Sequence, residues 1–404
     1  MTTRPAARQD LLLMAAIILL GLNLRPVLAA VGPLLDTLQR DTGLSDSAAG
    51  LLTTLPVLVM GLGALGGGLL HRLTGTGTGI AAGLALIAAA CALRGGVSGG
   101  GGLIASAIGA GLGIALVQAL LPAVIKGRFP DRAGPLMGLY TTGIMGGAAV
   151  AAASAAPLGA WLGWSGTLAV WAVPAAGALA LWLWVRPPED SPARRRAARP
   201  LPQPPLPLFP RPFRSRRAWL LMVFFGLGTG GYTLVLAWLP PYYTAMGWSA
   251  ADSGLLLGGM TLTEVAAGLA VSALIGRFAD RRPLLLAVLG LMLAGLGLLA
   301  FAPALAIPAV VLAGLGIGAL FPLSLIITLD HAHSPQQAGS LMGFVQGGGY
   351  VIASVMPVVA GLIREGTASL THAWTVMIAV TGVLVVIALR FSRASSALPV
   401  HTPE

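Results

Sequence analysis

Two ionisable residues lie alone within long apolar stretches of this 404-residue sequence, and their chemistry gives the first indication of function. Arg25 lies 14 residues beyond Leu11, and Glu264 lies 11 residues beyond Ser253. If both stretches are membrane-crossing helices, these separations correspond to depths of about 21 Å and about 16 Å. Charged side chains at such depths are costly and usually face a cavity or a charged partner.

Arg25 and Glu264 each have two possible roles. Arginine presents five N–H donors in a planar fork that suits small oxyanions and carboxylates. Arg25 is therefore a candidate anion-binding residue, and the alternative is a structural ion pair between Arg25 and Glu264. Because burial disfavours the charged form of a carboxylate, Glu264 is also a candidate proton-coupling residue.

The sequence Asn23-Leu24-Arg25-Pro26 predicts an interrupted helix. Pro26 has no N–H, so the Leu22 carbonyl loses its helical partner, and the proline biases Arg25 away from the α region. A broken helix at membrane depth is tolerated only where protein or a water-filled cavity covers it. A regular helix would point Asn23 and Arg25 about 200° apart, so only this break would let both reach one ligand.

Aromatic and amide side chains in other apolar stretches add candidates for a solute pocket. All five tyrosines fall in the stretches 133–158, 217–244 and 337–363. The predicted substrate-binding residues are Arg25, Asn23, Gln118, Tyr140, Tyr232, Trp238, Gln346 and Tyr350.

The composition is that of an integral membrane protein. Hydrophobic residues make up 56% of the chain and charged residues 9%, far from soluble norms. A bilayer core needs about 20 apolar residues per helix. Twelve segments meet this requirement: 11–35, 46–70, 77–94, 102–125, 133–158, 161–185, 217–244, 251–276, 283–302, 304–329, 337–363 and 371–391.

An internal repeat divides the segments into two sets of six. Ala133-Gly134-Pro135-Leu136-Met137-Gly138 returns as Ala338-Gly339-Ser340-Leu341-Met342-Gly343, and Gly50-Leu51-Leu52 returns as Gly254-Leu255-Leu256, at offsets of 205 and 204 residues. We therefore predict an all-α membrane protein of twelve helices in two pseudo-symmetric halves. The halves are 1–185 and 218–393, joined by a Pro- and Arg-rich cytoplasmic linker at 186–217 and followed by a cytoplasmic tail at 394–404.

The positions of the charges predict the topology. Twenty of the 24 basic residues fall on the side of the N-terminus, three (Arg40, Arg94 and Arg364) fall on the opposite side, and Arg25 lies within the membrane. This asymmetry follows the positive-inside rule and predicts that both termini are cytoplasmic. The net charge of +11 thus indicates topology and contact with anionic lipid, and we expect no nucleic-acid partner.

The sequence offers little for catalysis or metal binding. Cys91 is the only cysteine, so the chain cannot form an internal disulfide. The segments hold no gathering of His, Asp, Ser and Cys, so we expect no enzyme, no cofactor and no resident metal. Asp330-His331-Ala332-His333 leaves a weak metal site as an alternative.

Several runs resemble one transporter family. Twelve segments in two halves joined by a basic loop are similar to the major facilitator superfamily and, within it, to the cyanate/2-nitroimidazole transporter family. The runs that carry the resemblance are Asn23-Leu24-Arg25-Pro26, Ala30-Val31-Gly32-Pro33-Leu34, Gly50-Leu51-Leu52-Thr53-Thr54-Leu55-Pro56-Val57, Phe129-Pro130-Asp131-Arg132, Gly138-Leu139-Tyr140-Thr141-Thr142 and Trp238-Leu239-Pro240-Pro241. The resemblance implies that the first, second, fourth and fifth segments of each half line a central cavity.

The resemblance also implies alternating access, with two halves rocking about a midplane site. The superfamily's loop motif is present as Gly276-Arg277-Phe278-Ala279-Asp280-Arg281-Arg282. It implies a cytoplasmic gate in which Asp280 and Arg281 face the other half, with Asp280 against Arg128 or Arg132. The first half has only Leu69-Leu70-His71-Arg72 at the corresponding loop, so a symmetric gate is not expected.

We therefore expect a secondary active transporter of the bacterial plasma (inner) membrane that moves a small, anionic solute by alternating access. Protons are the candidate coupling ion, and the expected partners are the solute and membrane lipids, with the protein a monomer. The alternative within this class is an efflux pump for small aromatic drugs such as nitroimidazoles. An intramembrane enzyme, a channel and a ligand-sensing receptor are the less favoured classes.

Overall fold

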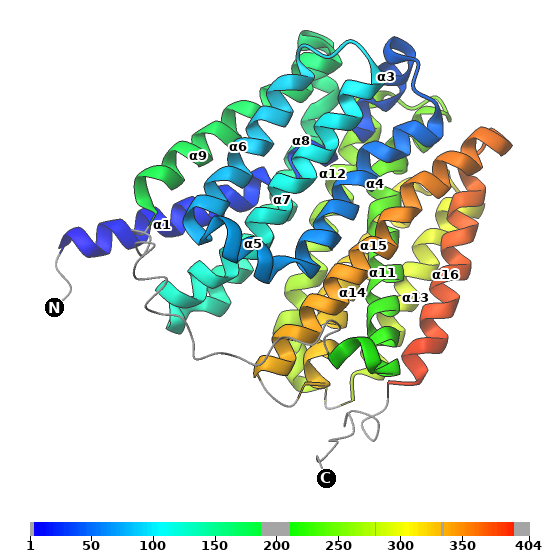
Figure 1. The fold of residues 1–404 in the computed structure, drawn as a ribbon. Coiled ribbons are helices and arrows are strands. Elements are labelled where there is room, and N and C mark those ends of the chain that lie inside the picture. Colours follow the sequence, from blue (N-terminus) through cyan, green and yellow to red (C-terminus); the bar gives the residue numbers. More distant parts are fainter. Residues whose placement is uncertain (1–3, 187–210, 279, 333–334, 392–404) are drawn as a thin grey trace.

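The computed structural model describes residues 4–186, 211–278, 280–332 and 335–391, and in these ranges the chain is helical with short connections (Figure 1). The elements are α1 (Arg4–Asn23), α2 (Pro26–Ala29), η1 (Gly32–Leu34), α3 (Leu35–Thr42), α4 (Asp46–Leu65), α5 (Gly67–Thr74), α6 (Thr76–Arg94), α7 (Gly100–Arg128), η2 (Pro130–Arg132), α8 (Ala133–Val170), α9 (Ala172–Val185), η3 (Arg211–Arg214), α11 (Arg216–Thr244), α12 (Ala250–Leu274), η4 (Ile275–Arg277), α13 (Arg282–Phe301), α14 (Ala306–Asp330), α15 (Pro335–Thr367) and α16 (Thr371–Leu389). Most of the predicted linker and all of the predicted tail lie outside the described residues.

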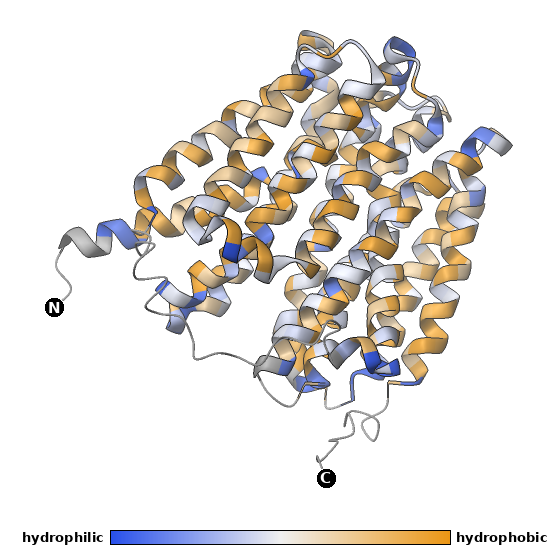
Figure 2. Ribbon diagram, viewed as in Figure 1, coloured by the Kyte–Doolittle hydropathy of each residue, from blue (hydrophilic) through white to orange (hydrophobic). Residues whose placement is uncertain are grey.

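The expectation of long apolar helices is confirmed. Within the described ranges, eleven helical stretches are long and apolar enough to cross a membrane. The longest, Pro130–Val185, contains Gly163 at a left-handed φ of 68°, which interrupts the helix at the third residue of the predicted sixth segment, 161–185. Apolar residues run along most of each helix, and hydrophilic residues lie mainly near the ends (Figure 2).

The predicted interruption of the first crossing is present between α1 and α2. Leu24 N–H turns back to the Gly21 carbonyl, and regular bonding resumes when Leu28 and Ala29 donate to the Arg25 carbonyl. The expectation that Arg25 leaves the α region is wrong, because its φ and ψ are −106° and −20°. The proline therefore offsets the helix without turning the chain into an extended segment.

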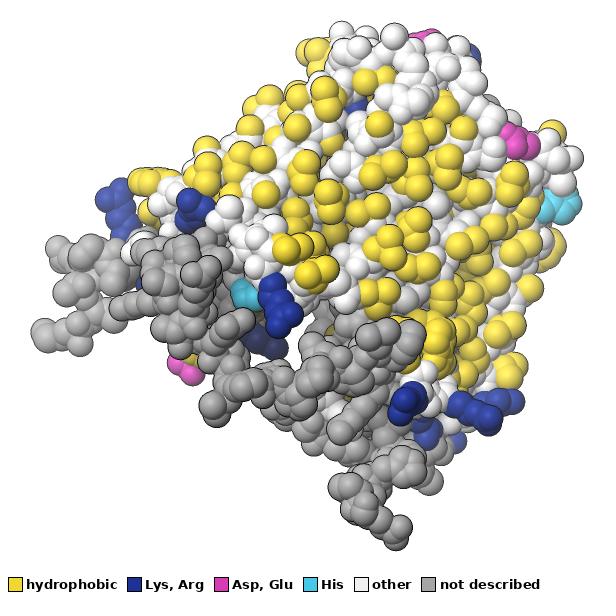
Figure 3. All heavy atoms as spheres, in the orientation of Figure 1, with side chains coloured by type: hydrophobic (Ala, Val, Ile, Leu, Met, Phe, Trp, Pro, Cys, Tyr) yellow, Lys and Arg dark blue, Asp and Glu magenta, His cyan; other side chains and the backbone are white. Residues whose placement is uncertain are grey.

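The helices pack as two sets that meet along two helix pairs. Before residue 187, α7 packs on α4 and α6, and α1 packs on α8; after residue 210, α11 packs on α15, and α14 packs on α12 and α13. The sets are joined mainly by α4 against α15 and by α8 against α12. Apolar side chains cover the middle of the visible face, whereas Lys and Arg lie toward its lower part (Figure 3).

The repeated glycines lie at these two contacts. A Cβ on Gly50 would lie 2.6 Å from the Pro357 carbonyl oxygen in α15, and one on Gly254 would lie 2.7 Å from the Ala152 carbonyl oxygen in α8. Lipid supplies no hydrophobic drive for helix association, so close backbone approach at small residues must provide the packing. The two copies of the repeat thus encode equivalent contacts between the sets.

Replacing Gly50 with alanine tests the α4–α15 contact. Because backbone atoms of Pro357 leave no room for a Cβ, we expect Gly50→Ala to destabilise the protein by about 1–3 kcal/mol and lower its melting temperature in detergent. Gly259→Ala on α12 is the matched control, since its Cβ would meet nothing within 4 Å. The control should melt at the wild-type temperature or slightly above, because alanine favours helix. Equal melting of the two variants would contradict this packing.

Candidate functional site

A cavity of about 580 Å³ lies between the two sets of helices. Its described lining comes from the α1–α2 junction, α4, α5, α7, α8, α11, α12, α14 and α15, and none of it from α6, α9, α13 or α16. These are the eight crossings that the resemblance implied, with the short α5 added at the rim.

The cavity extends toward one end of the molecule. Its lining includes Met137 near the start of α8, Gly343 near the start of α15 and Ser272 near the end of α12. We call this side, where α8 and α15 begin, the open end. At the opposite side, the closed end, α4 packs on α15 beside Gly50, and α12 packs on α8 beside Gly254.

Arg25 projects from the interrupted helix into the cavity wall and is only 5% exposed. Its Cζ lies 5.5 Å from the centroid of the Tyr232 ring, within the range of a cation–π contact. Its Nε has no hydrogen-bond partner. Among the ion pairs of the described residues, none joins Arg25 to Glu264. Within the described residues, the Arg25 guanidinium thus lines the cavity without forming an ion pair with a carboxylate.

Further polar groups surround Arg25. The hydroxyls of Tyr140 and Tyr232 and the Oε2 of Glu264 are buried and have no hydrogen-bond partner within the described chain. Gln118, Gln346 and Tyr350 also line the cavity, together with five serine and threonine residues. Buried polar groups in folded proteins are nearly always hydrogen-bonded. Together with the Arg25 Nε, the two tyrosine hydroxyls and the Glu264 Oε2 make four unpartnered groups on one cavity, which are suited to a polar solute, water or an exchangeable proton.

Two predicted substrate-binding residues lie away from the cavity lining. The Asn23 amide donates to the Leu19 carbonyl one turn earlier, at 2.8 Å. Trp238 is fully buried, and its Nε1 donates to the Pro357 carbonyl at 2.8 Å. Both side chains satisfy backbone groups, so the structure does not bring them together with Arg25.

The predicted gating residues lie at the open end and have local partners. Arg128 pairs with Asp10 at 2.8 Å, and Arg132 is exposed in η2. Asp280 pairs with Arg282 at 2.9 Å, and Arg281 pairs with Asp330 at 3.2 Å. Each of these pairs joins residues within one of the two sets.

A polar cluster at the closed end was not predicted from the sequence. Arg364 in α15 pairs with Asp46 at 3.3 Å and with Asp36 at 3.7 Å, and its Cζ lies 5.6 Å from the Trp238 ring centroid. Asp36 also accepts from the Thr244 hydroxyl at 2.5 Å. The cluster links α3 and α4 to α11 and α15. The sequence could have indicated this cluster, because its residues of opposite charge lie at segment ends that the predicted topology places on the same side of the membrane.

Arg94 is a second buried arginine, besides Arg25. It was predicted at the outer end of the segment 77–94, on the side opposite the N-terminus, and its side chain is only 1% exposed. Its position in the last turn of an apolar segment was the available signal.

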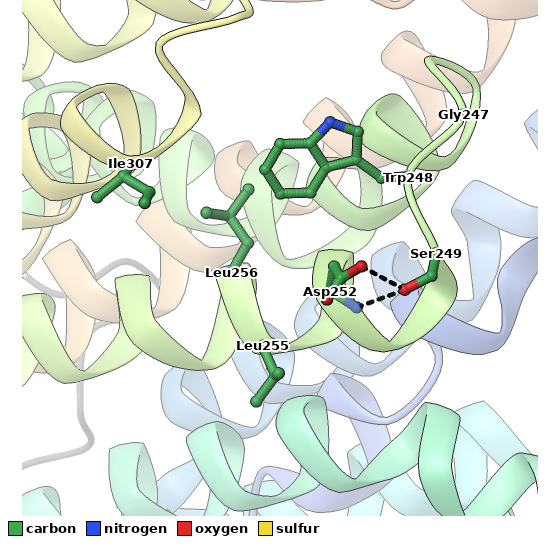
Figure 4. A pocket seen from close by; sticks show the side chains of 7 residues that line it. All are labelled: Gly247, Trp248, Ser249, Asp252, Leu255, Leu256 and Ile307. Atoms are coloured by element: carbon green, nitrogen blue, oxygen red, sulfur yellow. Dashed lines mark hydrogen bonds between the residues drawn. The ribbon is translucent and has the colours of Figure 1, made fainter.

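A second pocket, of about 550 Å³, lies at the turn between α11 and α12 (Figure 4). Its lining is Gly247, Trp248, Ser249, Asp252, Leu255, Leu256 and Ile307. The Ser249 hydroxyl accepts from the Asp252 N–H at 3.0 Å and donates to its carboxylate at 2.6 Å. These groups cap α12 and are already hydrogen-bonded to each other, so they are less available to a ligand than the unpartnered groups of the central cavity.

The metal alternative receives no support from the described residues. Within them, no group of three or more His, Cys, Asp or Glu side chains could hold a metal ion. His333 lies outside the described ranges.

Comparison with known proteins gives a consistent set of relatives. Residues 11–357 match the family model described as Major Facilitator Superfamily. The chain is 38% identical over 398 residues to the cyanate transport protein CynX of Escherichia coli, covering 97% of this chain and 98% of that protein. It is 30% identical over 368 residues to the 2-nitroimidazole transporter of Escherichia coli, covering 90% and 91%.

Solved structures share the fold. The crystal structure of a D-xylose-proton symporter aligns with a TM-score of 0.77 and 15% identity, covering 95% of this chain and 97% of the symporter. The nucleoside transporter NupG aligns with a TM-score of 0.75 and 13% identity, covering 94% and 100%. At these identities the likeness concerns the fold alone.

Proposed function

Because the chain belongs to the Major Facilitator Superfamily and its relatives CynX and the 2-nitroimidazole transporter are transporters and not enzymes, we propose that it carries a small anion across the bacterial inner membrane by alternating access. The anion is the proposed solute, and a proton is the proposed coupling ion. The protein would act as a monomer within the lipid.

The Arg25 guanidinium carries this proposal. A buried cation is strongly destabilised unless an opposite charge and hydrogen bonds compensate for lost hydration. Arg25 is 5% exposed, has an unpartnered Nε–H, and stacks on the Tyr232 ring, which compensates only in part. A small anion would supply the charge and accept a charge-assisted hydrogen bond. The 38% identical relative is a cyanate transport protein, which supports an anion of this size.

The surrounding groups would orient the anion. The hydroxyls of Tyr140 and Tyr232 are available donors, and the amides of Gln118 and Gln346 line the same cavity. Asn23 and Trp238 would act from behind the lining, because each already bonds a backbone carbonyl.

Alternating access would exchange the open and closed ends. With the termini in the cytoplasm, as the positive-inside distribution favours, the open end faces the cytoplasm. Arg128, Arg132, Asp280 and Arg281 would then form new contacts across the entrance when it closes. Arg364 and its partners would separate at the outer face, and the two six-helix halves would rock about the cavity.

Glu264 is the proposed proton-coupling residue. It lies in the same cavity as Arg25, is 5% exposed, and has one carboxyl oxygen without a partner. A carboxyl that exchanges its proton during the cycle would link solute movement to a proton gradient.

Efflux of a small aromatic compound is the second candidate. The 30% identity to a 2-nitroimidazole transporter favours it, as does an aromatic part of the cavity wall. There the Phe225 ring lies 5.6 Å from Tyr350 and 5.5 Å from Phe321, centroid to centroid. Aromatic stacking would then select the solute, and Arg25 would be dispensable.

Ligand-dependent melting of wild type and Arg25→Ala distinguishes the two candidates. The panel is cyanate, formate, nitrate and 2-nitroimidazole. A ligand at 100 times its Kd stabilises the native state by about 2.7 kcal/mol. We expect a small anion to raise the wild-type melting temperature and to have no effect on Arg25→Ala. Stabilisation by 2-nitroimidazole alone, retained in Arg25→Ala, would replace the anion proposal with efflux.

Proton coupling predicts a selective defect in Glu264→Gln. Glutamine keeps the shape of the side chain but cannot exchange a proton. In proteoliposomes with an imposed pH gradient, the variant should fail to concentrate cyanate while still exchanging labelled for unlabelled cyanate. Glu365→Gln, which alters a carboxylate at the closed end, is the control and should still respond to the gradient. Gradient-driven accumulation by Glu264→Gln would eliminate Glu264 as the coupling residue.

Loss of the Arg364 ion pairs should favour opening at the outer face. Cys91 is buried, so a cysteine introduced at the cavity-lining Met145 can serve as the reporter. An impermeant thiol reagent applied to intact cells should label Met145→Cys more strongly when combined with Arg364→Gln. Arg40→Gln is the matched control, because the Arg40 hydrogen bonds stay within α3. Equal labelling with Arg364→Gln and Arg40→Gln would contradict a role for this cluster in closure.

A further inference from the structure

Arg94 is a buried charged residue that the proposed transport cycle leaves without a role. It is the last residue of α6 and is only 1% exposed. Its Nε donates to the Ser106 hydroxyl in α7 at 2.9 Å, and its Nη1 donates to the Val27 carbonyl in α2 at 2.7 Å. The side chain therefore ties two helices to the segment that follows Arg25.

The Val27 carbonyl lacks the backbone N–H donor that a regular helix would give it. In a regular helix it would accept from the Val31 N–H, but that N–H bonds to the Leu28 carbonyl at 3.2 Å. The adjacent Pro26 carbonyl retains its partner, the Ala30 N–H, at 3.0 Å. A backbone carbonyl buried at membrane depth needs another donor, and the Arg94 guanidinium supplies it.

The charge on Arg94 needs a reason beyond packing. Among the ion pairs of the described residues, none includes Arg94, and its Nη2 has no hydrogen-bond partner. The carboxyl end of α6 offers a partial negative charge that favours a cation there. A long side chain with donors pointing in two directions can reach both Ser106 and Val27, which a lysine ammonium reaches less well.

We propose that Arg94 is a positioning residue that sets the direction of the Arg25 guanidinium. Arg25 lies at the junction of two anchored pieces. On one side, α1 packs on α8, where Gly21 lies against the Tyr140 carbonyl. On the other side, the Arg25 carbonyl begins α2, and Arg94 holds α2 through Val27. The inference rests on the proposed function only in that Arg25 binds the transported anion.

The first test is cyanate uptake by proteoliposomes containing Arg94→Lys. We expect KM to rise about tenfold, as when one hydrogen bond to a charged group is weakened, with the maximal rate nearly unchanged. Ser106→Ala, a milder change that removes the Nε partner and the Ser106 hydrogen bond to the Leu103 carbonyl within α7, should raise KM in the same direction and covers the case in which Arg94→Lys folds poorly. Arg40→Lys, at an exposed arginine, should leave KM unchanged.

A double-mutant cycle with Arg25→Lys shows whether Arg94 acts through Arg25. If it does, Arg94→Lys should raise KM much less in the Arg25→Lys background than in the wild type. Independent, multiplicative effects on KM would overturn the proposal, as would an unchanged KM in Arg94→Lys and Ser106→Ala while Arg25→Lys raises it.

Hydrogen exchange gives a readout that does not depend on the solute. Peptides covering residues 24–34 should exchange faster in Arg94→Lys than in wild type or Arg40→Lys, because α2 has lost its tie. Unchanged exchange would overturn the positioning role. If exchange rises but Arg25→Lys leaves KM unaltered, the anion proposal fails while the Arg94 tie to α2 stands.

Discussion

The interrupted first crossing at Arg25 is the constraint on which the arrangement of the site depends. Lipid offers no hydrogen bonds, so the backbone groups freed by Pro26 and the charge of Arg25 cannot face the bilayer. The break must therefore turn inward, where other helices and a polar cavity cover it. The bond from Arg94 to Val27 satisfies a further carbonyl, which the turn after α2 leaves without a backbone donor. Backbone chemistry and solute chemistry thus share one location.

The closed end combines contacts that are individually weak. Arg364, Asp46 and Asp36 have side chains 21%, 20% and 41% exposed, and partly exposed ion pairs contribute little each. The glycine contacts at Gly50 and Gly254 depend on close fit between backbones and bury no large side chain. Such a closure can hold one arrangement and still release it, which suits a protein that exchanges two conformations of similar free energy.

Under the proposed function, charge and not volume would give the cavity its selectivity. A space of about 580 Å³ admits a three-atom anion with water or a small aromatic ring equally well. The difference lies in the walls, where Arg25 and Glu264 face an otherwise largely apolar lining. In a low-dielectric site an unpaired guanidinium interacts with an anion far more strongly than it would in water.

The sequence alone determined the apolar segments, the repeat and the two ionisable residues of the cavity, because hydropathy and the cost of a membrane charge are properties of the chain itself. It could not show that Trp238 turns to the Pro357 carbonyl, since the side-chain direction depends on a helix more than 100 residues away. For the same reason it placed Arg94 and Arg364 only at the outer ends of their segments and gave them no partners. Only tertiary packing decided that one supports the broken helix and the other joins the two helix sets, because both roles depend on which distant oxygens come within hydrogen-bond or ion-pair distance.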